Sequence, residues 1–236
     1  MKFLAMFIAA ALLLTVPVAA QSLDPNDPRL LRRSLNETPY RLFVPAEYDG
    51  SRSYPLVLFL HGGAGRGRDN ERHLLDGNGM LFNMFLTAQA QFPSIVLAPQ
   101  TSSEHGVEPT LAVLRHVMKE YRVDRTRVYL IGQSLGGYGA LDLLASEPAL
   151  FAAAVVISAG GPENRVRGHA MLPTWFFHGE RDDVIPVEQP RRMVDAIKRA
   201  GGQVRYTEYK DEGHGLAWLV RGESSLIPWI FAQRRQ

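Results

Sequence analysis

A serine between glycines, directly after a run of apolar residues, is the part of this sequence best suited to chemistry. Gly132-Gln133-Ser134-Leu135-Gly136 follows the apolar run 127–131 and precedes 137–145, which has the composition of a helix with small residues in its first turn. Strand, G-x-S-x-G and helix together predict a sharp turn that holds a serine in a strained conformation and exposes its hydroxyl. Without this context the motif would suit a glycine-rich loop equally well. We therefore predict Ser134 as a nucleophile.

A serine hydroxyl needs a general base, and the base needs a carboxylate that orients it. After a serine on such a turn, the carboxylate and then the histidine follow along the chain, each in a loop after a strand. The sequence offers Asp182 after the apolar run 174–177, and His214 between two glycines after the run 204–209. Ser134, Asp182 and His214 are therefore the predicted catalytic residues.

Two other carboxylates compete for the orienting role. Asp183 is adjacent to Asp182, but we expect it to be solvated or to cap the turn that begins at Val184. Asp211 precedes His214 by only three residues, and we expect it to cap its own loop.

The other histidines suit structural roles better than catalysis. His61 and His178 each end an apolar run before a glycine, which favours hydrogen bonds from their rings to loop backbone. The remaining four lie in polar stretches and are expected to be solvated, although one of them, His105, could line the edge of the site: His73, His105, His116 and His169.

Two backbone N–H groups are expected to stabilise the negative oxygen that forms when a serine attacks a carbonyl group. One belongs to Leu135, directly after the nucleophile. The other is expected from the glycine-rich loop 61–65 after the apolar run 56–60, where Gly63 is the first choice and Ala64 the second. The loop lacks the G-x-x-x-x-G-K-[ST] pattern of a phosphate-binding turn.

Apolar runs alternate with helical patterns from about residue 38 onward. The expected strands are 40–44, 56–60, 95–98, 128–131, 154–158, 174–177 and 204–209, and the expected helices are 81–91, 110–121, 135–146, 188–200 and 226–233. Continuous apolar runs are typical of strands that helices cover on both faces. The alternation predicts an α/β fold with a doubly wound, mostly parallel sheet.

The site is expected to lack a lid domain. The segment 159–173 joins two expected strands and is too short to form a helical lid, so we predict an open site. Trp218 follows His214 closely and could offer a flat apolar wall to a sugar or aryl ring; packing against the core is its alternative role.

The first residues have the pattern of an export signal. Lys2, the apolar run 3–20 and the small residues at its end predict a signal peptide, residues 1–20, cleaved before Gln21. A membrane anchor is the alternative, but the run is short and contains Pro17 near its end. We expect residues 21–37 to form a loosely held N-terminal arm, and residues 38–236 to form one domain. The protein would then be periplasmic or secreted from a bacterium, with no stable membrane anchor after cleavage.

The composition argues against several other classes of protein. The formal net charge is +2 and no basic stripe follows the chain, so no nucleic-acid partner is expected. The chain has no cysteine, which excludes disulfides and thiolate metal sites. Histidines and carboxylates do not cluster at helical spacing, so neither a metal nor a cofactor is expected.

Further motifs resemble one family of proteins. They are Tyr40–Pro45, Tyr54–Gly63, Gly67–Asn70, Val123–Tyr129, Gly132–Tyr138, Phe151–Ala153 and Glu212–His214. In these residues the chain resembles the small secreted α/β-hydrolases classified as predicted peptidases, which are related to phospholipase/carboxylesterases, dienelactone hydrolases and feruloyl esterases. The resemblance covers about residues 38–220. It implies the α/β-hydrolase fold, the Ser-Asp-His triad and hydrolysis of small-molecule or polymer-borne carboxylic esters, with short-chain or aromatic acyl groups that can be linked to carbohydrate.

The resemblance is less informative about the substrate. Leu135 stands where methionine is frequent in the family, and the segment 71–93, which borders the expected site, carries no clear motif. A peptidase of the prolyl-oligopeptidase type would use the same triad, although such enzymes carry a large gating domain for which this chain has no room. A non-catalytic hydrolase-like binding protein is a third alternative, but such proteins usually have a broken triad.

Overall fold

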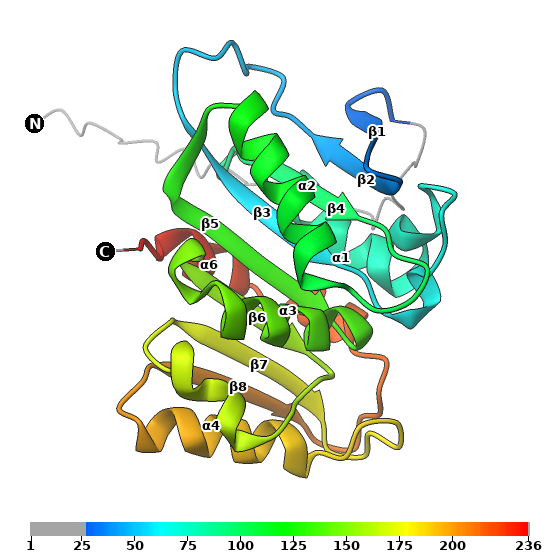
Figure 1. The fold of residues 1–236 in the computed structure, drawn as a ribbon. Coiled ribbons are helices and arrows are strands. Elements are labelled where there is room, and N and C mark those ends of the chain that lie inside the picture. The colour runs from blue at the N-terminus through cyan, green and yellow to red at the C-terminus, as the bar shows by residue number, and fades with distance from the viewer. Residues whose placement is uncertain (1–26, 236) are drawn as a thin grey trace, which may run out of the picture.

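Eight strands form one sheet, and helices pack against both of its faces (Figure 1). The computed structural model describes residues 27–235. The strands are β1 (Leu30–Leu35), β2 (Thr38–Phe43), β3 (Tyr54–Leu60), β4 (Ile95–Pro99), β5 (Val123–Gln133), β6 (Ala153–Ile157), β7 (Thr174–Gly179) and β8 (Val204–Tyr209). Their order is β1-β2-β4-β3-β5-β6-β7-β8. The pairs β1–β2 and β2–β4 are antiparallel and the other five pairs are parallel, so the predicted mostly parallel sheet is confirmed.

The helices form two layers, one on each face. They are α1 (Asp76–Thr87), α2 (Val107–Glu120), α3 (Leu135–Ser146), α4 (Glu188–Arg199), α5 (Ala217–Gly222) and α6 (Leu226–Ala232). The helices α1, α5 and α6 share a core with one face of the sheet, and α2, α3 and α4 cover the other. Figure 1 is viewed from the side of α2 and α3. All five expected helices are present, α1 begins at Asp76 instead of Leu81, and α5 was not expected.

Strand β3 shows why the central apolar runs are continuous. Val57 and Phe59 pack with the layer of α1, α5 and α6, whereas Leu56, Leu58 and Leu60 pack with the opposite layer. Successive side chains of a strand point to opposite faces, and here both faces are covered. The doubly wound arrangement predicted from the sequence is confirmed.

The N-terminal segment differs from the expectation. Residues 30–35 form the edge strand β1, in antiparallel register with β2, and Leu30 is part of the core. The prediction of a loosely held arm up to residue 37 is therefore wrong for this stretch, and the sheet begins at residue 30. Most of this edge strand is exposed, so its sequence shows no clear alternation of apolar and polar residues. Residues 1–26, with the predicted signal peptide, lie outside the described residues.

The topology determines where a ligand can bind. The parallel strands β3 and β5 are neighbours in the sheet, and β3 leads to β4 on one side while β5 leads to β6 on the other. Open α/β sheets bind ligands beyond the carboxyl ends of the strands at such a switch point. The loop after β3 and the turn after β5 lie at this point, so residues 61–65 and Ser134 are brought together.

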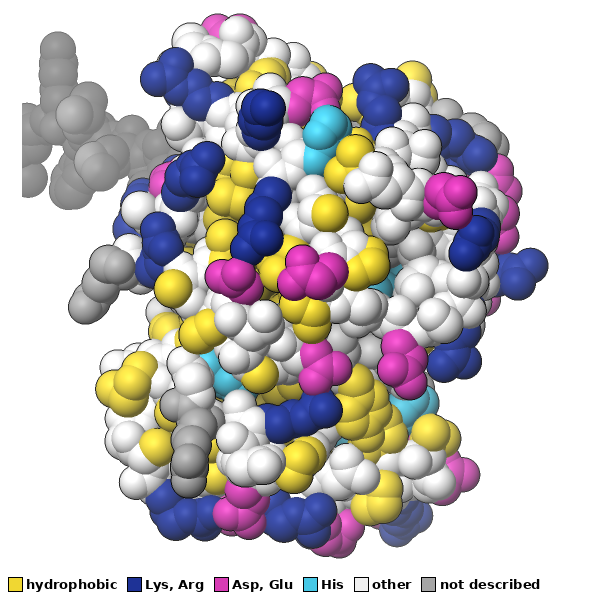
Figure 2. Space-filling view, viewed as in Figure 1, with side chains coloured by type: hydrophobic (Ala, Val, Ile, Leu, Met, Phe, Trp, Pro, Cys, Tyr) yellow, Lys and Arg dark blue, Asp and Glu magenta, His cyan; other side chains and the backbone are white. Residues whose placement is uncertain are grey.

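The segment between β6 and β7 contains only a short 3-10 helix, Glu163–Gly168, so no lid domain covers the described fold at this position. Among residues 27–235, no helix is long and apolar enough to cross a membrane. Figure 2, in the same view, shows basic and acidic side chains interspersed on this face of the molecule.

Candidate active site

Ser134 lies at the turn between β5 and α3 and has an uncommon backbone conformation. Its φ is 52° and its ψ is −114°, a combination that non-glycine residues rarely adopt. The N–H of Ser134 donates to the carbonyl oxygen of Ile157 at 2.8 Å, which ties the turn to the end of β6. The strained turn predicted for Ser134 is present in the structure.

The two flanking glycines are required by close backbone contacts. A Cβ atom on Gly132 would lie 2.1 Å from the carbonyl oxygen of Gly136, and one on Gly136 would lie 2.0 Å from that of Leu60. Backbone atoms cannot move aside as the end of a flexible side chain can. Any larger residue at either position would therefore displace the turn that carries Ser134.

Ser134, His214 and Asp182 form a continuous chain of hydrogen bonds. His214 Nε2 is 2.9 Å from Ser134 Oγ, and His214 Nδ1 is 2.8 Å from Asp182 Oδ2. Because a carboxylate can only accept, Nδ1 carries the proton of the neutral ring and Nε2 is free to accept from the serine hydroxyl. The structure thus brings together the three side chains that the sequence predicted, from the loops after β5, β7 and β8.

Asp182 is buried, and backbone N–H groups hold its second carboxylate oxygen. Oδ1 accepts from the N–H of Val184 at 2.9 Å and from that of Ile185 at 2.8 Å. Asp182 itself therefore caps the turn that was expected for Asp183, whose side chain is exposed. Asp211 is also exposed and pairs with Arg181.

The loop of His214 is held by contacts that the sequence did not indicate. Ser158 Oγ donates to the carbonyl oxygen of His214 at 2.9 Å, from a residue with a φ of 48° at the end of β6. A Cβ atom on Gly179 would lie 2.2 Å from the carbonyl oxygen of Gly213, so the end of β7 also packs tightly against this loop. These contacts fix the position of the His214 ring.

His61 and His178 make the backbone hydrogen bonds that were predicted for them. His61 Nδ1 is 2.8 Å from the carbonyl oxygen of Gly62, and its Nε2 accepts from the N–H of Thr101 at 3.1 Å. His178 Nε2 is 2.9 Å from the carbonyl oxygen of Ile185.

Three histidines that were expected to be solvated are buried, so this prediction was wrong for them. His73, His105 and His169 are 0%, 6% and 2% exposed, whereas His116 is exposed as expected. His105 Nε2 donates to the carbonyl oxygen of His61 at 3.0 Å, and the two rings lie 4.4 Å apart. Burial lowers the pKa of His61 to about 4 and that of His73 and His105 to about 3. These rings are therefore neutral and act as packing groups behind the glycine-rich loop.

The glycine-rich loop after β3 is oriented from both sides. The N–H of Gly62 donates to Asn78 Oδ1 at 2.7 Å, and Asn78 is a buried residue of α1 that the sequence did not single out. The carbonyl oxygen of Gly62 faces His61 Nδ1. The carbonyl and N–H of a trans peptide point in opposite directions. Because the Gly62 carbonyl faces His61, the N–H of Gly63 points away from His61. A Cβ atom on Gly62 would lie 3.6 Å from Ser134 Cβ, which places this peptide beside the serine.

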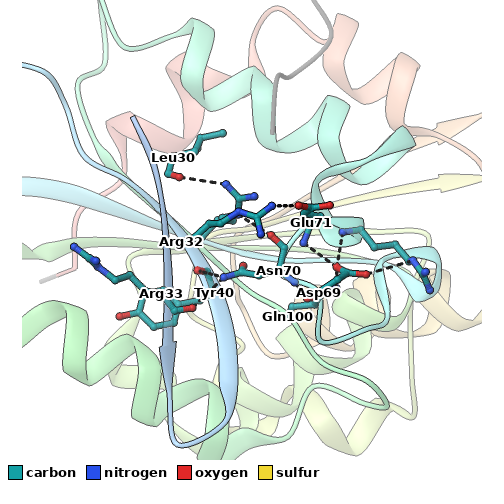
Figure 3. Close-up of polar contacts among 10 residues, drawn as sticks. Leu30, Arg32, Arg33, Tyr40, Asp69, Asn70, Glu71 and Gln100 are labelled. Carbon is teal, nitrogen blue, oxygen red and sulfur yellow. Dashed lines mark hydrogen bonds and ion pairs between the residues drawn. The ribbon is translucent and has the colours of Figure 1, made fainter. Parts of the chain in front are cut away.

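The rest of this loop is tied to three strands (Figure 3). The N–H of Asn70 donates to Gln100 Oε1 at 2.6 Å, and Gln100 Nε2 donates to the carbonyl oxygen of Gly65 at 3.1 Å. Asn70 Nδ2 reaches the carbonyl oxygens of Arg33 in β1 and Tyr40 in β2, at 3.0 and 3.1 Å. The loop is therefore held firmly even though its sequence has no regular pattern.

A cleft of about 470 Å³ opens above Ser134 and His214. Its other lining residues are Gly62, Gly63, Ala64, Asp76, Gly77, Asn78, Met80, Gln133, Gly215, Ala217 and Trp218. Trp218 on α5 is 58% exposed, so it lines the cleft instead of packing fully into the core. Within residues 27–235, no group of three or more His, Cys, Asp and Glu side chains is placed to hold a metal ion.

Comparisons with known proteins agree with this fold and site. Residues 101–160 and 158–226, more than half of the chain, match the Prolyl oligopeptidase family. The chain belongs to this family, and the predicted resemblance to esterases and peptidases with the α/β-hydrolase fold is confirmed.

Individual relatives include both esterases and a peptidase. "Probable feruloyl esterase C" of Aspergillus terreus is 26% identical over 199 residues, which cover 80% of this chain and 72% of that protein. "Uncharacterized peptidase YuxL" of Bacillus subtilis is 21% identical over 226 residues, and the match covers 75% of this chain but 33% of that protein. The crystal structure of a thermostable esterase superposes with a TM-score of 0.78 at 34% identity, covering 87% of this chain and 63% of that chain.

Proposed function

We propose that this chain is a serine carboxylesterase that forms an acyl-enzyme on Ser134. Its likeness to feruloyl esterases and to a thermostable esterase supports the assignment to the carboxylic ester hydrolases. The observation that carries the proposal is the hydrogen-bonded chain from Ser134 through His214 to Asp182 at the floor of an open cleft.

In the acylation step, Ser134 Oγ attacks the carbonyl carbon of the ester while His214 Nε2 takes the hydroxyl proton. Asp182 accepts from Nδ1–H, so it holds the reactive tautomer and stabilises the imidazolium that forms. His214 then gives the proton to the leaving alcohol. In deacylation, water attacks the acyl-enzyme with the same histidine as base, which releases the acid and restores Ser134.

The developing negative oxygen needs donors that are already in place. We assign this role to the backbone N–H groups of Gly63 and Leu135. Leu135 is the first residue of α3, so its N–H lies at the positive end of the helix dipole. The Gly62–Gly63 peptide lies beside Ser134 and is held by His61 and Asn78.

The shape of the cleft supports acyl groups that are short or aromatic. Ser134 and His214 remain partly exposed, and the segment between β6 and β7 is short, so the cleft is open to soluble or polymer-borne esters. The exposed indole of Trp218 and the small residues Gly77 and Ala217 form an apolar wall that suits an aryl or sugar ring. Relatives named feruloyl esterase support the aromatic choice.

Peptide hydrolysis is the second candidate, because the chain matches the Prolyl oligopeptidase family and one of its relatives is named as a peptidase. The same triad can cleave amides, but an amine leaves less readily than an alcohol and needs more assistance. The match spans only 33% of that peptidase, so most of the peptidase has no counterpart in this alignment. We therefore rank ester hydrolysis first.

One series of substrates tests the substrate class. p-Nitrophenyl esters of increasing acyl length, methyl ferulate, an acetylated sugar and a dipeptide amide are compared by kcat/KM. We expect the highest values for acetyl, butyryl or feruloyl esters. Trp218→Ala should raise KM for methyl ferulate more than for p-nitrophenyl acetate. An optimum at dodecanoyl or longer, or faster cleavage of the amide, would reject this substrate class.

A reactive-serine probe separates an enzyme from a non-catalytic relative. A fluorophosphonate should label Ser134 in the wild-type protein, because only an activated serine reacts with it quickly. Failure to label would favour a binding protein.

We further propose that the protein acts in the periplasm or outside the cell, on the basis of the export pattern in residues 1–20.

A further inference from the structure

Besides His214, a second histidine contacts the carboxylate of the proposed triad, and this one is buried. The side chain of His178 on β7 is fully buried, and its Nε2 lies 3.2 Å from Asp182 Oδ2 and 2.9 Å from the carbonyl oxygen of Ile185. Both neighbours can only accept, so His178 Nε2 carries a proton. Its hydrogen bond goes to Ile185, and the charged Oδ2 of Asp182 lies beside the same N–H. Oδ2 is also the oxygen that faces His214 Nδ1 at 2.8 Å. One carboxylate oxygen therefore accepts from His214 and also lies beside the Nε2–H of His178.

The His178 ring is neutral in this position. Burial lowers the pKa of His178 and outweighs the hydrogen bond to Ile185 and the negative charges of Asp182 and Glu208, which act in the opposite direction. Its Nδ1 is buried and has no hydrogen-bond partner among the described residues. A proton on Nδ1 would be a buried donor without an acceptor, which is costly.

The charged groups around His178 are themselves paired. Glu208 on β8 lies opposite His178 in the sheet register. Its carboxylate accepts from Arg191 Nε at 2.9 Å and from Tyr206 Oη at 2.7 Å. The positive charge of Arg191 offsets the negative charge of Glu208. The close charged groups that still face His178 are therefore Asp182 and, when protonated, His214.

Building on the proposed function, we propose that His178 is a positioning residue that tunes the catalytic base through Asp182. The positive end of the His178 N–H lies beside Oδ2 and partly offsets the charge of the carboxylate, so less of that charge stabilises protonated His214. Without His178, the carboxylate would hold the His214 proton more strongly. His214 would then remain protonated, and inactive as a base, up to a higher pH.

The pH dependence of kcat/KM for p-nitrophenyl butyrate tests this role. His178→Met removes the donor, and we expect the midpoint of the acidic limb to move up by about half a pH unit, with KM unchanged. His178→Gln places an amide N–H near the position of Nε2 and should return the midpoint to the wild-type value. The control is His169→Phe, because the His169 ring is also buried but neither of its nitrogens has a hydrogen-bond partner among the described residues.

Two results would overturn the proposal. One is a His178→Met protein with the wild-type midpoint, and the other is an equal shift in His178→Gln, since a purely structural role would not distinguish the two. If His178→Met does not fold, nuclear magnetic resonance of the wild-type protein with isotope-labelled histidine still decides. We expect the neutral Nε2–H tautomer of His178 at about pH 7, because burial lowers the pKa of this ring. The Nδ1–H tautomer would place no N–H beside Asp182 and would overturn the proposal.

This tautomer readout does not depend on activity. If Ser134→Ala kept full esterase activity, the proposed function would be rejected. The resonance of His178 would be unchanged by that result. The two failures can therefore be told apart.

Discussion

The position of each proton determines what the three central side chains can do. Asp182 binds Val184 and Ile185 through one oxygen and His214 through the other, so its carboxylate cannot rotate without breaking hydrogen bonds. This fixed carboxylate keeps the proton of His214 on Nδ1 and leaves Nε2 to accept from Ser134. We therefore expect reactivity at Ser134 to depend on Asp182 and not on the adjacent Asp183.

Asp182→Asn and Asp183→Asn separate the two neighbours. An amide at position 182 can donate to His214 and favour the wrong tautomer, so we expect kcat for p-nitrophenyl butyrate to fall by about 10⁴-fold with little change in KM. Asp183 is exposed, and its variant should stay within about threefold of wild type. A large loss in Asp183→Asn, with Asp182→Asn active, would reverse the assignment.

At the residue scale, the sequence predicts a role where a motif sets the order of the residues along the chain. It does not predict burial that depends on contacts between distant segments. The motif order predicted Ser134, Asp182 and His214. His73 follows two charged residues and His105 follows Glu104, and both rings become buried where the loops after β3 and β4 fold together around His61. No local pattern could indicate that packing.

At the scale of elements, each part of the site comes from the end of a different strand, and one contribution comes from a helix. Strand β5 positions Ser134, and the loop after β3 carries the proposed oxyanion donor Gly63. Helix α1 holds that loop through Asn78, which accepts the N–H of Gly62. Packing of α1 therefore affects the geometry of the site directly.

Asn78→Ala tests this link. The variant leaves the N–H of Gly62 without its acceptor and loosens the peptide that presents Gly63, so we expect kcat to fall by about tenfold or more. Thr87→Ala at the other end of α1 is the control and should keep wild-type kcat, because the Thr87 hydroxyl donates to the carbonyl oxygen of Met84 within its own helix, far from the glycine-rich loop in the sequence of the helix. Equal kcat in both variants would exclude a role for Asn78 in orienting the loop.

The elements missed from the sequence are those with the weakest local signal. Strand β1 is an edge strand whose side chains are mostly exposed, and α5 is too short for a helical period to be seen. The start of α1 contains Gly77 and Gly79, which are weak helix formers. A close contact with the preceding turn explains the second glycine, because a Cβ atom on Gly79 would lie 2.0 Å from the carbonyl oxygen of Leu74. The inner strands are continuous apolar runs, and all of them were predicted.

For the whole molecule, the buried histidines connect packing with stability in acid. Burial lowers the pKa of His61 and His169 to about 4, and that of His73 and His105 to about 3. In the unfolded chain these rings titrate near pH ~6.5. As the pH falls below that value, the unfolded chain binds protons that the folded protein cannot, so the free energy of unfolding decreases.

Each such histidine should contribute a loss of about 1.4 kcal/mol per pH unit between about pH 6.5 and its folded pKa. Urea unfolding at pH 7.5 and pH 5 measures the total effect. His169→Phe should reduce the decrease in the free energy of unfolding by the contribution of one histidine. His116→Gln, at an exposed position, should leave that decrease unchanged. An unchanged pH dependence in His169→Phe would show that this ring is protonated in the folded protein.

The central claim is that Ser134 is the nucleophile of an ester hydrolase, and the rate of the Ser134→Ala protein tests it most directly. The variant loses only the hydroxyl, so we expect the circular dichroism and the melting temperature to stay close to wild type. The kcat for p-nitrophenyl butyrate should fall by about 10⁴-fold or more. A folded Ser134→Ala protein that hydrolyses this ester at the wild-type rate would contradict the account.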